Sequence, residues 1–209
     1  SMVPPDTKAG LAAYFSGDRN FDSSSTSPIS NNPFIQNTDK IDARDLKINE
    51  VEKSHYAIAQ KIKQMLMADA VPQNSSGISA DDVGVQLRVN SDVMFKPGSI
   101  ELLPEGTKVL EAVLKLMNEY NLYLVVRGHA DSSEAKPPFA SAWELSGARS
   151  SAMVHYLASH GIKPTRMRAV SYGDTRPLKP GIDEQSRALN RRVEFFFHRP
   201  EVMSYSVVY

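Results

Sequence analysis

The ten residues LYLVVRGHAD, at positions 122–131, join an apolar strand to a polar end. The run over 122–127 has the length and composition of a β-strand. A glycine, His129 and Asp131 follow within four residues, at the carboxyl end of that strand, which is where α/β sheets commonly bind ligands. This stretch therefore predicts a strand whose end carries a candidate binding site.

Segments with strand and helix periodicity alternate on both sides of it. Val85, Leu87 and Val89 alternate with polar residues, as in a half-buried strand. Pro104 suits the first turn of a helix, and a capping box at 141–144 starts another. The expected order is strand 83–89, helix 104–121, strand 122–127, helix 141–161, strand 167–172, short helix 183–189 and strand 192–197. We therefore predict an α/β (α+β) domain, β-α-β-α-β-(α)-β, with helices packed on a mixed sheet in two layers.

The chain before residue 83 is expected to lie outside this compact domain. Apolar residues recur at helical spacing over 46–70, and Asn74 to Gly77 suggests a turn. Residues 16–39 are rich in turn formers and poor in apolar side chains. The predicted divisions are 1–45, a short helix and flexible linker; 46–82, a linker helix and turn; 83–198, the compact domain; and 199–209, a tail.

The composition of the 209 residues excludes several classes of protein. Apolar residues make up 41%, and 24 Lys+Arg balance 24 Asp+Glu, so no global field attracts nucleic acid or an anionic membrane. The absence of Cys excludes disulfides, thiolate zinc sites and a cysteine nucleophile. The sequence contains no apolar run long enough to span a membrane and no signal peptide. The opening Ser1-Met2 suggests that the native chain begins further upstream.

The residue chemistry near the end of the strand suggests a ligand with two opposite charges. If the second helix packs back on the sheet, Arg149 in its first turns lies close to Asp131. Arginine offers a planar fork of donors to a carboxylate, and aspartate accepts from an ammonium group. The pair therefore suits a zwitterion. The alternative is that Asp131 and Arg149 form a simple salt bridge with each other. A further polar cluster, Asn190-Arg191-Arg192, opens the last strand.

Two other kinds of function find little support. His129, His155 and His160 could suggest a metal or hydrolase site, but the last two diverge on a helix, and a Gly-x-Ser-x-Gly motif is absent. Residues 149–199 hold ten Lys/Arg against four Asp/Glu, yet this surplus is not interleaved with exposed aromatic residues, as nucleic-acid binding favours. We therefore expect no catalytic residue, no metal, no cofactor and no nucleic-acid partner.

Six short motifs follow one another in an order that matches a known family. They are FKPGSIEL at 95–102, GHAD at 128–131, WELSGAR at 143–149, Gly161-Ile162, YGDTRP at 172–177 and NRRVE at 190–194. Together they resemble the OmpA-like peptidoglycan-binding domain over 85–197. In that family, the Asp after Gly-His-Thr and the Arg after Leu-Ser contact the diaminopimelate residue of the peptidoglycan stem peptide. The resemblance implies that Asp131 and Arg149 bind it, with His129, Asn190 and Arg191 in the same site.

The WELS motif is also similar to the MotB group of flagellar stator subunits. Leu11, Tyr14 and Phe15, at helical spacing, resemble the plug segment just outside the membrane span of that group. The resemblance implies a non-enzymatic wall anchor that is the periplasmic part of a single-pass inner-membrane protein, a homodimer with a MotA-like membrane subunit as partner. The N-terminal segment would regulate ion flow and linker extension. The alternative is a general outer-membrane or lipoprotein wall anchor without a motor role.

Two residues depart from this pattern, and the linker adds a mechanical hypothesis. Ala130 stands where the family usually has Thr, and Ala142 where stator proteins usually have Asn, so both lack the hydrogen-bonding groups of those residues. Residues 16–45, fully extended, could span up to about 100 Å. We expect the helix over 46–69 to pack on the domain in a resting dimer and its release to let the domain reach the wall.

Overall fold

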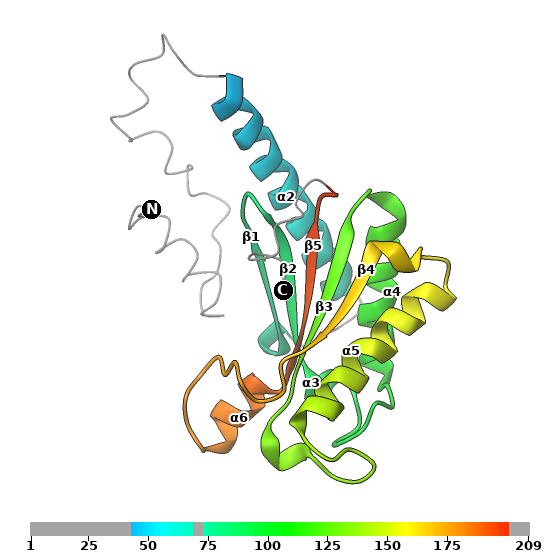
Figure 1. Cartoon of the computed structure of the whole chain (residues 1–209). Helices are drawn as coiled ribbons and strands as arrows, with labels where there is room; N and C mark the ends of the chain where they lie inside the picture. Colours follow the sequence, from blue (N-terminus) through cyan, green and yellow to red (C-terminus); the bar gives the residue numbers. More distant parts are fainter. Residues whose placement is uncertain (1–42, 69–72, 201–209) are drawn as a thin grey trace.

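The computed structural model describes residues 43–68 and 73–200 (Figure 1). Its helices are α2 (Ala43–Ala68), α3 (Ser91–Met94), α4 (Pro104–Glu119), α5 (Ala142–Ser159) and α6 (Glu184–Asn190), and its strands are β1 (Ser76–Ala80), β2 (Gly84–Asn90), β3 (Tyr123–His129), β4 (Met167–Ser171) and β5 (Arg192–His198). The candidate plug residues Leu11, Tyr14 and Phe15 lie outside the described residues, as do the linker before residue 43 and the tail from residue 201.

The strands form one mixed sheet in the order β1-β2-β5-β3-β4. All neighbours are antiparallel except β3 and β4, which run parallel. Helices α2, α4 and α5 pack on one face of this sheet (Figure 1). The structure therefore confirms the predicted two-layer α/β architecture, with the strand at 122–127 in the interior of the sheet between β5 and β4.

The core lies between the sheet and these helices. Val193, Phe195 and Phe197 of β5 are almost completely buried against residues from the helices, such as Leu110 and Met153. Because side chains alternate across a strand, the intervening residues of β5 occupy the other face of the sheet. Glu194 therefore lies on the face opposite α4 and α5, where it meets polar residues of β2 and β3.

The sequence interpretation was wrong at the start of the sheet. The expected turn at Asn74–Gly77 is a short 3₁₀ turn that leads directly into β1, which pairs with β2 from Ser76 opposite Val89 to Ala80 opposite Val85. Its sequence SGISA has little intrinsic strand preference, so β2 provides the hydrogen-bonding partner that the local pattern did not reveal. The sheet thus begins at Ser76, upstream of residue 83.

Helix α2 packs against the same core. Ile58, Ile62 and Leu66 are only 2–4% exposed and belong to the core cluster. His55 makes a hydrogen bond of 2.5 Å between its Nδ1 and the carbonyl oxygen of Asp81, beside the β1–β2 turn. In this structure the linker helix is therefore docked on the domain. Among residues 43–68 and 73–200, no helix is both long and apolar enough to cross a membrane.

Candidate functional site

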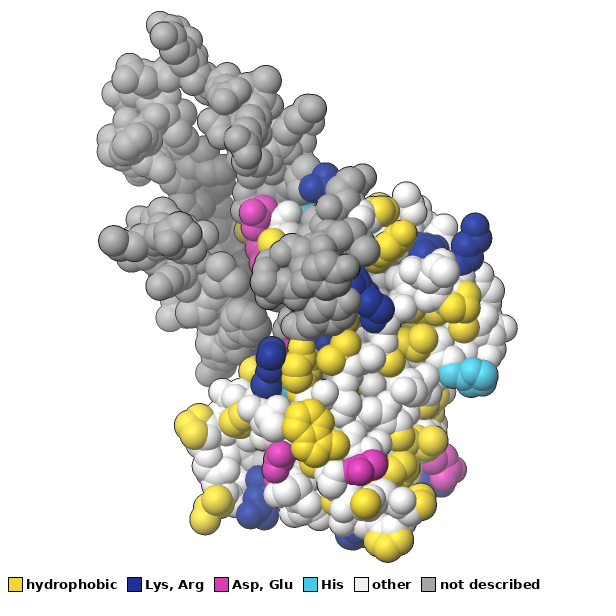
Figure 2. Space-filling model, in the orientation of Figure 1, with side chains coloured by type: hydrophobic (Ala, Val, Ile, Leu, Met, Phe, Trp, Pro, Cys, Tyr) yellow, Lys and Arg dark blue, Asp and Glu magenta, His cyan; other side chains and the backbone are white. Residues whose placement is uncertain are grey.

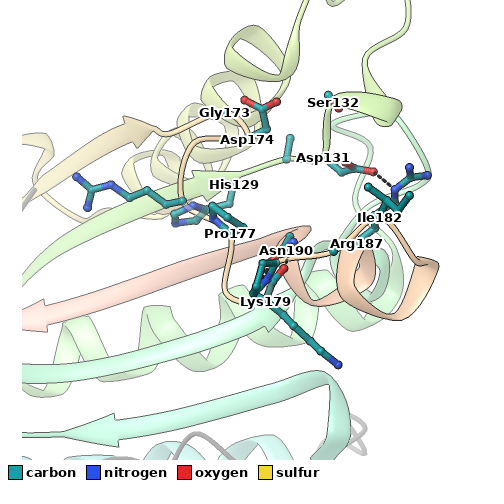
Figure 3. Close-up of a pocket in the computed structure, with 14 residues that line it drawn as sticks. His129, Asp131, Ser132, Gly173, Asp174, Pro177, Lys179, Ile182, Arg187 and Asn190 are labelled. Carbon is teal, nitrogen blue, oxygen red and sulfur yellow. Dashed lines mark hydrogen bonds and ion pairs between the residues drawn. The ribbon is translucent and has the colours of Figure 1, made fainter.

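A polar pocket opens at the carboxyl end of β3, between the loop after β4 and helix α6 (Figure 3). It encloses about 250 Å³. Its lining combines acidic, basic and small residues: His129, Ala130, Asp131, Ser132, Gly173, Asp174, Arg176, Pro177, Lys179, Pro180, Gly181, Ile182, Arg187 and Asn190. The end of β3 thus carries a pocket, and its volume suits one amino-acid side chain better than a large ligand.

Close packing of α5 on β3 fixes the position of this strand end. A Cβ at Gly128 would lie 2.1 Å from the carbonyl oxygen of Ser146, so only glycine permits this approach. Ser146 is completely buried, and its Oγ accepts a hydrogen bond from the backbone N–H of Gly173. The N–H of Ala130 in turn donates to the carbonyl of Gly173 at 2.9 Å. These bonds join β3, α5 and the loop after β4 into one support.

Gly173 itself has a positive φ of 58°, which favours glycine. A Cβ there would lie 3.0 Å from the indole of Trp143. Trp143 therefore packs against the pocket wall from outside.

Asp131 is the acidic residue of the pocket closest to fixed positive charge. Its Oδ2 lies 3.9 Å from Nε of Arg187 and 4.0 Å from Nη1 of Arg191. Figure 3 shows Asp131 and Arg187 pointing toward each other across the pocket. Arg187 is 39% exposed at its side chain, so solvent and a ligand can both reach it.

Arg191 lies near the pocket without lining it. Its guanidinium donates to both carboxylate oxygens of Asp92, at 3.2 and 2.9 Å, and also to Glu184. Burial opposes the charged form, but these bonds prevail and raise the pKa of Arg191. Its hydrogen bonds thus tie α6 and the start of β5 to α3, which indicates a supporting role.

Asn190 lines the pocket and supports its wall. Its Oδ1 accepts from the backbone N–H groups of Leu178 and Lys179, at 2.7 and 3.1 Å, and its Nδ2 donates to the carbonyl of Lys179 at 3.0 Å. All of these bonds hold the loop before α6. Asn190 therefore shapes the pocket while its amide is already engaged.

Arg149 is brought to the same end of the molecule as Asp131, but it does not line the pocket. It is 1% exposed, and its Nη1 donates to Oε2 of Glu134 at 2.9 Å. Oε1 of Glu134 accepts from the backbone N–H of Asp131 at 3.1 Å. The two residues that the sequence paired are therefore joined through Glu134. Both sequence predictions for this pair are therefore wrong: Asp131 and Arg149 do not face one open pocket, and they do not form a direct salt bridge with each other.

His129 is a buried residue of the pocket lining, and it holds the end of β3 in place. Its Nε2 lies 2.5 Å from Oε1 of Glu194, and its ring stacks on Tyr172 at 5.2 Å. Burial lowers the pKa of His129 despite the hydrogen bond to Glu194. Burial would raise the pKa of Glu194, but its bond to His129 and the charge of Arg192 keep that pKa below its ordinary value. At neutral pH the pair is thus a neutral imidazole beside a carboxylate.

Two of the histidines named in the metal or hydrolase alternative, His129 and His160, have different neighbours. His129 is paired with Glu194, whereas His160 stacks on Tyr156 at 4.1 Å near the far end of α5. Within the ranges 43–68 and 73–200, no three potential metal-ligating residues gather. The basic surplus over 149–199 is a separate question. On the face of the molecule drawn in Figure 2, basic and acidic side chains of the described residues are scattered and form no single basic patch.

The sequence interpretation missed two site residues. Arg187 lies three positions before Asn190 on the short helix α6, a spacing that places both on one helical face. Glu134 forms a capping box with Asp131, the same pattern that identified the start of α5. Both signals were therefore present in the sequence, although nothing in it showed that Glu134 would meet Arg149.

The two departures from the family pattern are neighbours in space. Ala130 and Ala142 are both nearly buried, and they form a small apolar cluster with Leu145 and Phe139. The cluster is therefore apolar at both positions at once.

The mixed sheet, the helices on one face and the polar pocket at the end of β3 define a two-layer α/β domain with a candidate binding pocket. The model of the OmpA family matches residues 94–191, and the chain belongs to this family.

Known relatives agree with this assignment. The structure is similar to that of a MotB-like protein from Desulfovibrio vulgaris, with 30% identity and a TM-score of 0.66 over 73% of this chain and 98% of that one. The periplasmic domain of Helicobacter pylori MotB is 27% identical, with a TM-score of 0.54 over 60% of this chain and 80% of that one. The peptidoglycan-associated lipoprotein of Pseudomonas aeruginosa is 34% identical over 108 residues, 52% of this chain. The chain spans 62% of that lipoprotein's length, and a similar or smaller share of other curated relatives.

Proposed function

We propose that this domain binds peptidoglycan without covalent chemistry and so anchors a larger protein to the cell wall. The observation that carries this proposal is Asp131, placed in a pocket of single-residue size beside the exposed cation Arg187. The membership of the OmpA family and the similarity to a peptidoglycan-associated lipoprotein support it.

The ligand that fits this arrangement is the diaminopimelate residue of the stem peptide. Its free end carries an ammonium group and a carboxylate on one carbon. Asp131 would accept from the ammonium group, and an arginine would donate to the carboxylate. The family pattern assigns that arginine to Arg149, with His129, Asn190 and Arg191 as supporting residues of the same site. No group in this scheme forms or breaks a covalent bond.

The larger role that we propose is the anchor of a flagellar stator. Similarity to MotB from H. pylori and to a MotB-like protein supports it. The full protein would then be a homodimer in the inner membrane with a MotA-like partner, and this domain would lie in the periplasm. Leu11, Tyr14 and Phe15 would form the plug that limits ion flow. The docked α2 would be the resting position of the linker helix, and its release would extend the anchor.

The alternative is a general outer-membrane or lipoprotein anchor. The 34% identity to the lipoprotein of P. aeruginosa favours it. The sequence upstream of residue 1 distinguishes the two: a single apolar helix with an ion-carrying aspartate indicates a stator, and a lipobox or β-barrel indicates the general anchor.

Sedimentation with purified sacculi tests the proposal. The parent protein should sediment with them, and Asp131→Asn should reduce the bound fraction at least about tenfold because a neutral amide cannot pair with the ammonium group. The control is Asp82→Asn, an exposed carboxylate at the opposite end of the sheet, which should bind like the parent. Equal binding by Asp131→Asn and the parent would rule out this site.

A further inference from the structure

Arg149 is closed to any ligand in this structure. Its side chain is 2% exposed, and that of Glu134 is 9% exposed. Besides its bond to Glu134, Arg149 donates from Nε to the carbonyl of Ser99 at 3.0 Å, and its guanidinium lies 5.3 Å from the ring centre of Phe95. A carboxylate in the pocket therefore meets Arg187 directly, but it cannot meet Arg149 unless Glu134 moves.

Glu134 occupies the place that a bound amino acid would need. One of its carboxylate oxygens accepts from Arg149, and the other accepts from the backbone N–H of Asp131. Its carboxylate thus lies between the two residues expected to hold the ligand. We propose that Glu134 is an internal competitor: it neutralises Arg149 in the unbound protein, and a ligand carboxylate reaches Arg149 only by displacing it. This inference rests on the proposed binding of diaminopimelate.

The exchange is physically reasonable because Arg149 remains paired throughout. A buried guanidinium without a partner is strongly unfavourable, so an empty, uncompensated Arg149 would destabilise the domain. Replacing one carboxylate by another avoids that state. The ligand therefore binds more weakly than it would to a free Arg149, because breaking the Arg149–Glu134 pair offsets part of the free energy gained on binding.

The arrangement also has a consequence for specificity. A stem peptide with lysine in place of diaminopimelate has the ammonium group but no second carboxylate. It can contact Asp131, yet it cannot displace Glu134 from Arg149. Removing Glu134 should therefore help the diaminopimelate peptide and leave the lysine peptide unchanged.

The contacts around Glu134 indicate which segment would move. Its backbone N–H donates to the carbonyl of Asp131 at 3.0 Å. Its carbonyl oxygen packs close to Gly98, since a Cβ added to that glycine would lie only 3.3 Å from it. Seven residues further on, the chain enters α5 through Ser141. The segment 132–141 is thus held at both ends, so a turn of the Glu134 side chain or a shift within this segment would open Arg149.

Binding of the tripeptide L-Ala-γ-D-Glu-meso-diaminopimelate to the 209-residue protein tests this inference, with the lysine tripeptide as the comparison ligand. Glu134→Gln keeps the size of the side chain but removes its charge, and its single acceptor oxygen can serve only one of the two N–H donors that Glu134 accepts from. It should bind the diaminopimelate tripeptide about tenfold more tightly than the parent, because a neutral amide holds Arg149 less strongly. Its affinity for the lysine tripeptide should stay that of the parent.

Two further variants keep the test interpretable. Glu119→Gln removes an exposed carboxylate that pairs with Lys61 on another part of the surface, and it should bind both peptides like the parent. If Glu134→Gln does not fold, Glu134→Asp should give a smaller gain in the same direction, because its shorter side chain reaches Arg149 less well. The thermal midpoint of each variant shows whether it is folded.

The possible failures are distinguishable. If the parent binds the diaminopimelate tripeptide and folded Glu134→Gln binds it equally or more weakly, Glu134 is a structural partner of Arg149 and the competitor inference is wrong, while the proposed function stands. An equal gain for both peptides also contradicts it. If neither the parent nor any variant binds the tripeptide or sediments with sacculi, the proposed function fails and this inference fails with it.

Discussion

Replacing Ile62 with alanine tests whether α2 is an integral part of the folded domain. Ile62 is 2% exposed and lies in the core cluster between Ile58 and Leu66 on one face of the helix. Truncating a buried isoleucine to alanine costs about 2–5 kcal/mol, because apolar contacts are lost and a cavity remains. The three side chains together contribute about 5–9 kcal/mol of gross apolar burial, at about 1.5–3 kcal/mol each. We therefore expect a large loss of stability from this one change.

The assay is equilibrium unfolding in urea, followed by circular dichroism. Gln64→Ala, on the exposed face of the same helix, is the matched control and should change the free energy of unfolding by less than about 0.5 kcal/mol. A loss below about 1 kcal/mol for Ile62→Ala would refute the docked position of α2. The result also bears on the stator hypothesis, since any release of the linker helix must overcome the free energy that this packing supplies.

Three other changes test the support of the site. Because burial lowers the pKa of His129 below its ordinary 6.5, the folded state prefers the neutral ring. The stability that this preference gives to the domain is fully present above about pH 6.5, and it is lost as the pH falls through the lowered pKa. His129→Gln should therefore flatten the fall of the thermal midpoint between about pH 7 and pH 5, and an unchanged pH profile would contradict the assignment. Gly128→Ala should destabilise the domain by about 3 kcal/mol or more, since its Cβ would meet the Ser146 carbonyl at 2.1 Å; an unchanged midpoint in thermal unfolding would exclude this close packing. Arg187→Gln should weaken sedimentation with sacculi about three- to tenfold without a change in thermal midpoint, and parent-like binding would remove Arg187 from the site.

Most of the strands and helices could be predicted from the sequence because each of these had a strong local signal. β2 alternates apolar and polar residues, α4 begins at a proline, and α5 begins at the capping box of Ser141 and Glu144. The edge strand β1 lacked such a signal, since its sequence SGISA is stabilised by pairing with β2. Local patterns therefore identified α2, α4, α5, α6 and the strands β2 to β5, and missed β1 and the four-residue helix α3.

The sequence predicted the position of Asp131 but not the surroundings of Arg149, because only the first depends on local signals. The position of Asp131 at the end of β3 follows from strand and turn signals, and it lines the pocket. The burial of Arg149 could not be predicted, because it depends on the loops that carry Ser99 and Glu134, which lie 50 and 15 residues away along the chain. Charge type and spacing indicate which residues could form an ion pair, but the packing of distant loops decides which pairs form.

The pocket at the end of β3 should receive the doubly charged end of diaminopimelate. NMR can locate this contact through the amide chemical shifts of the 209-residue protein, recorded as the diaminopimelate tripeptide is added. We expect saturable shifts to concentrate at 128–134, 173–181 and 187–190, around Asp131. Saturable shifts confined to another part of the sheet or to α2, with these segments unaffected, would contradict it.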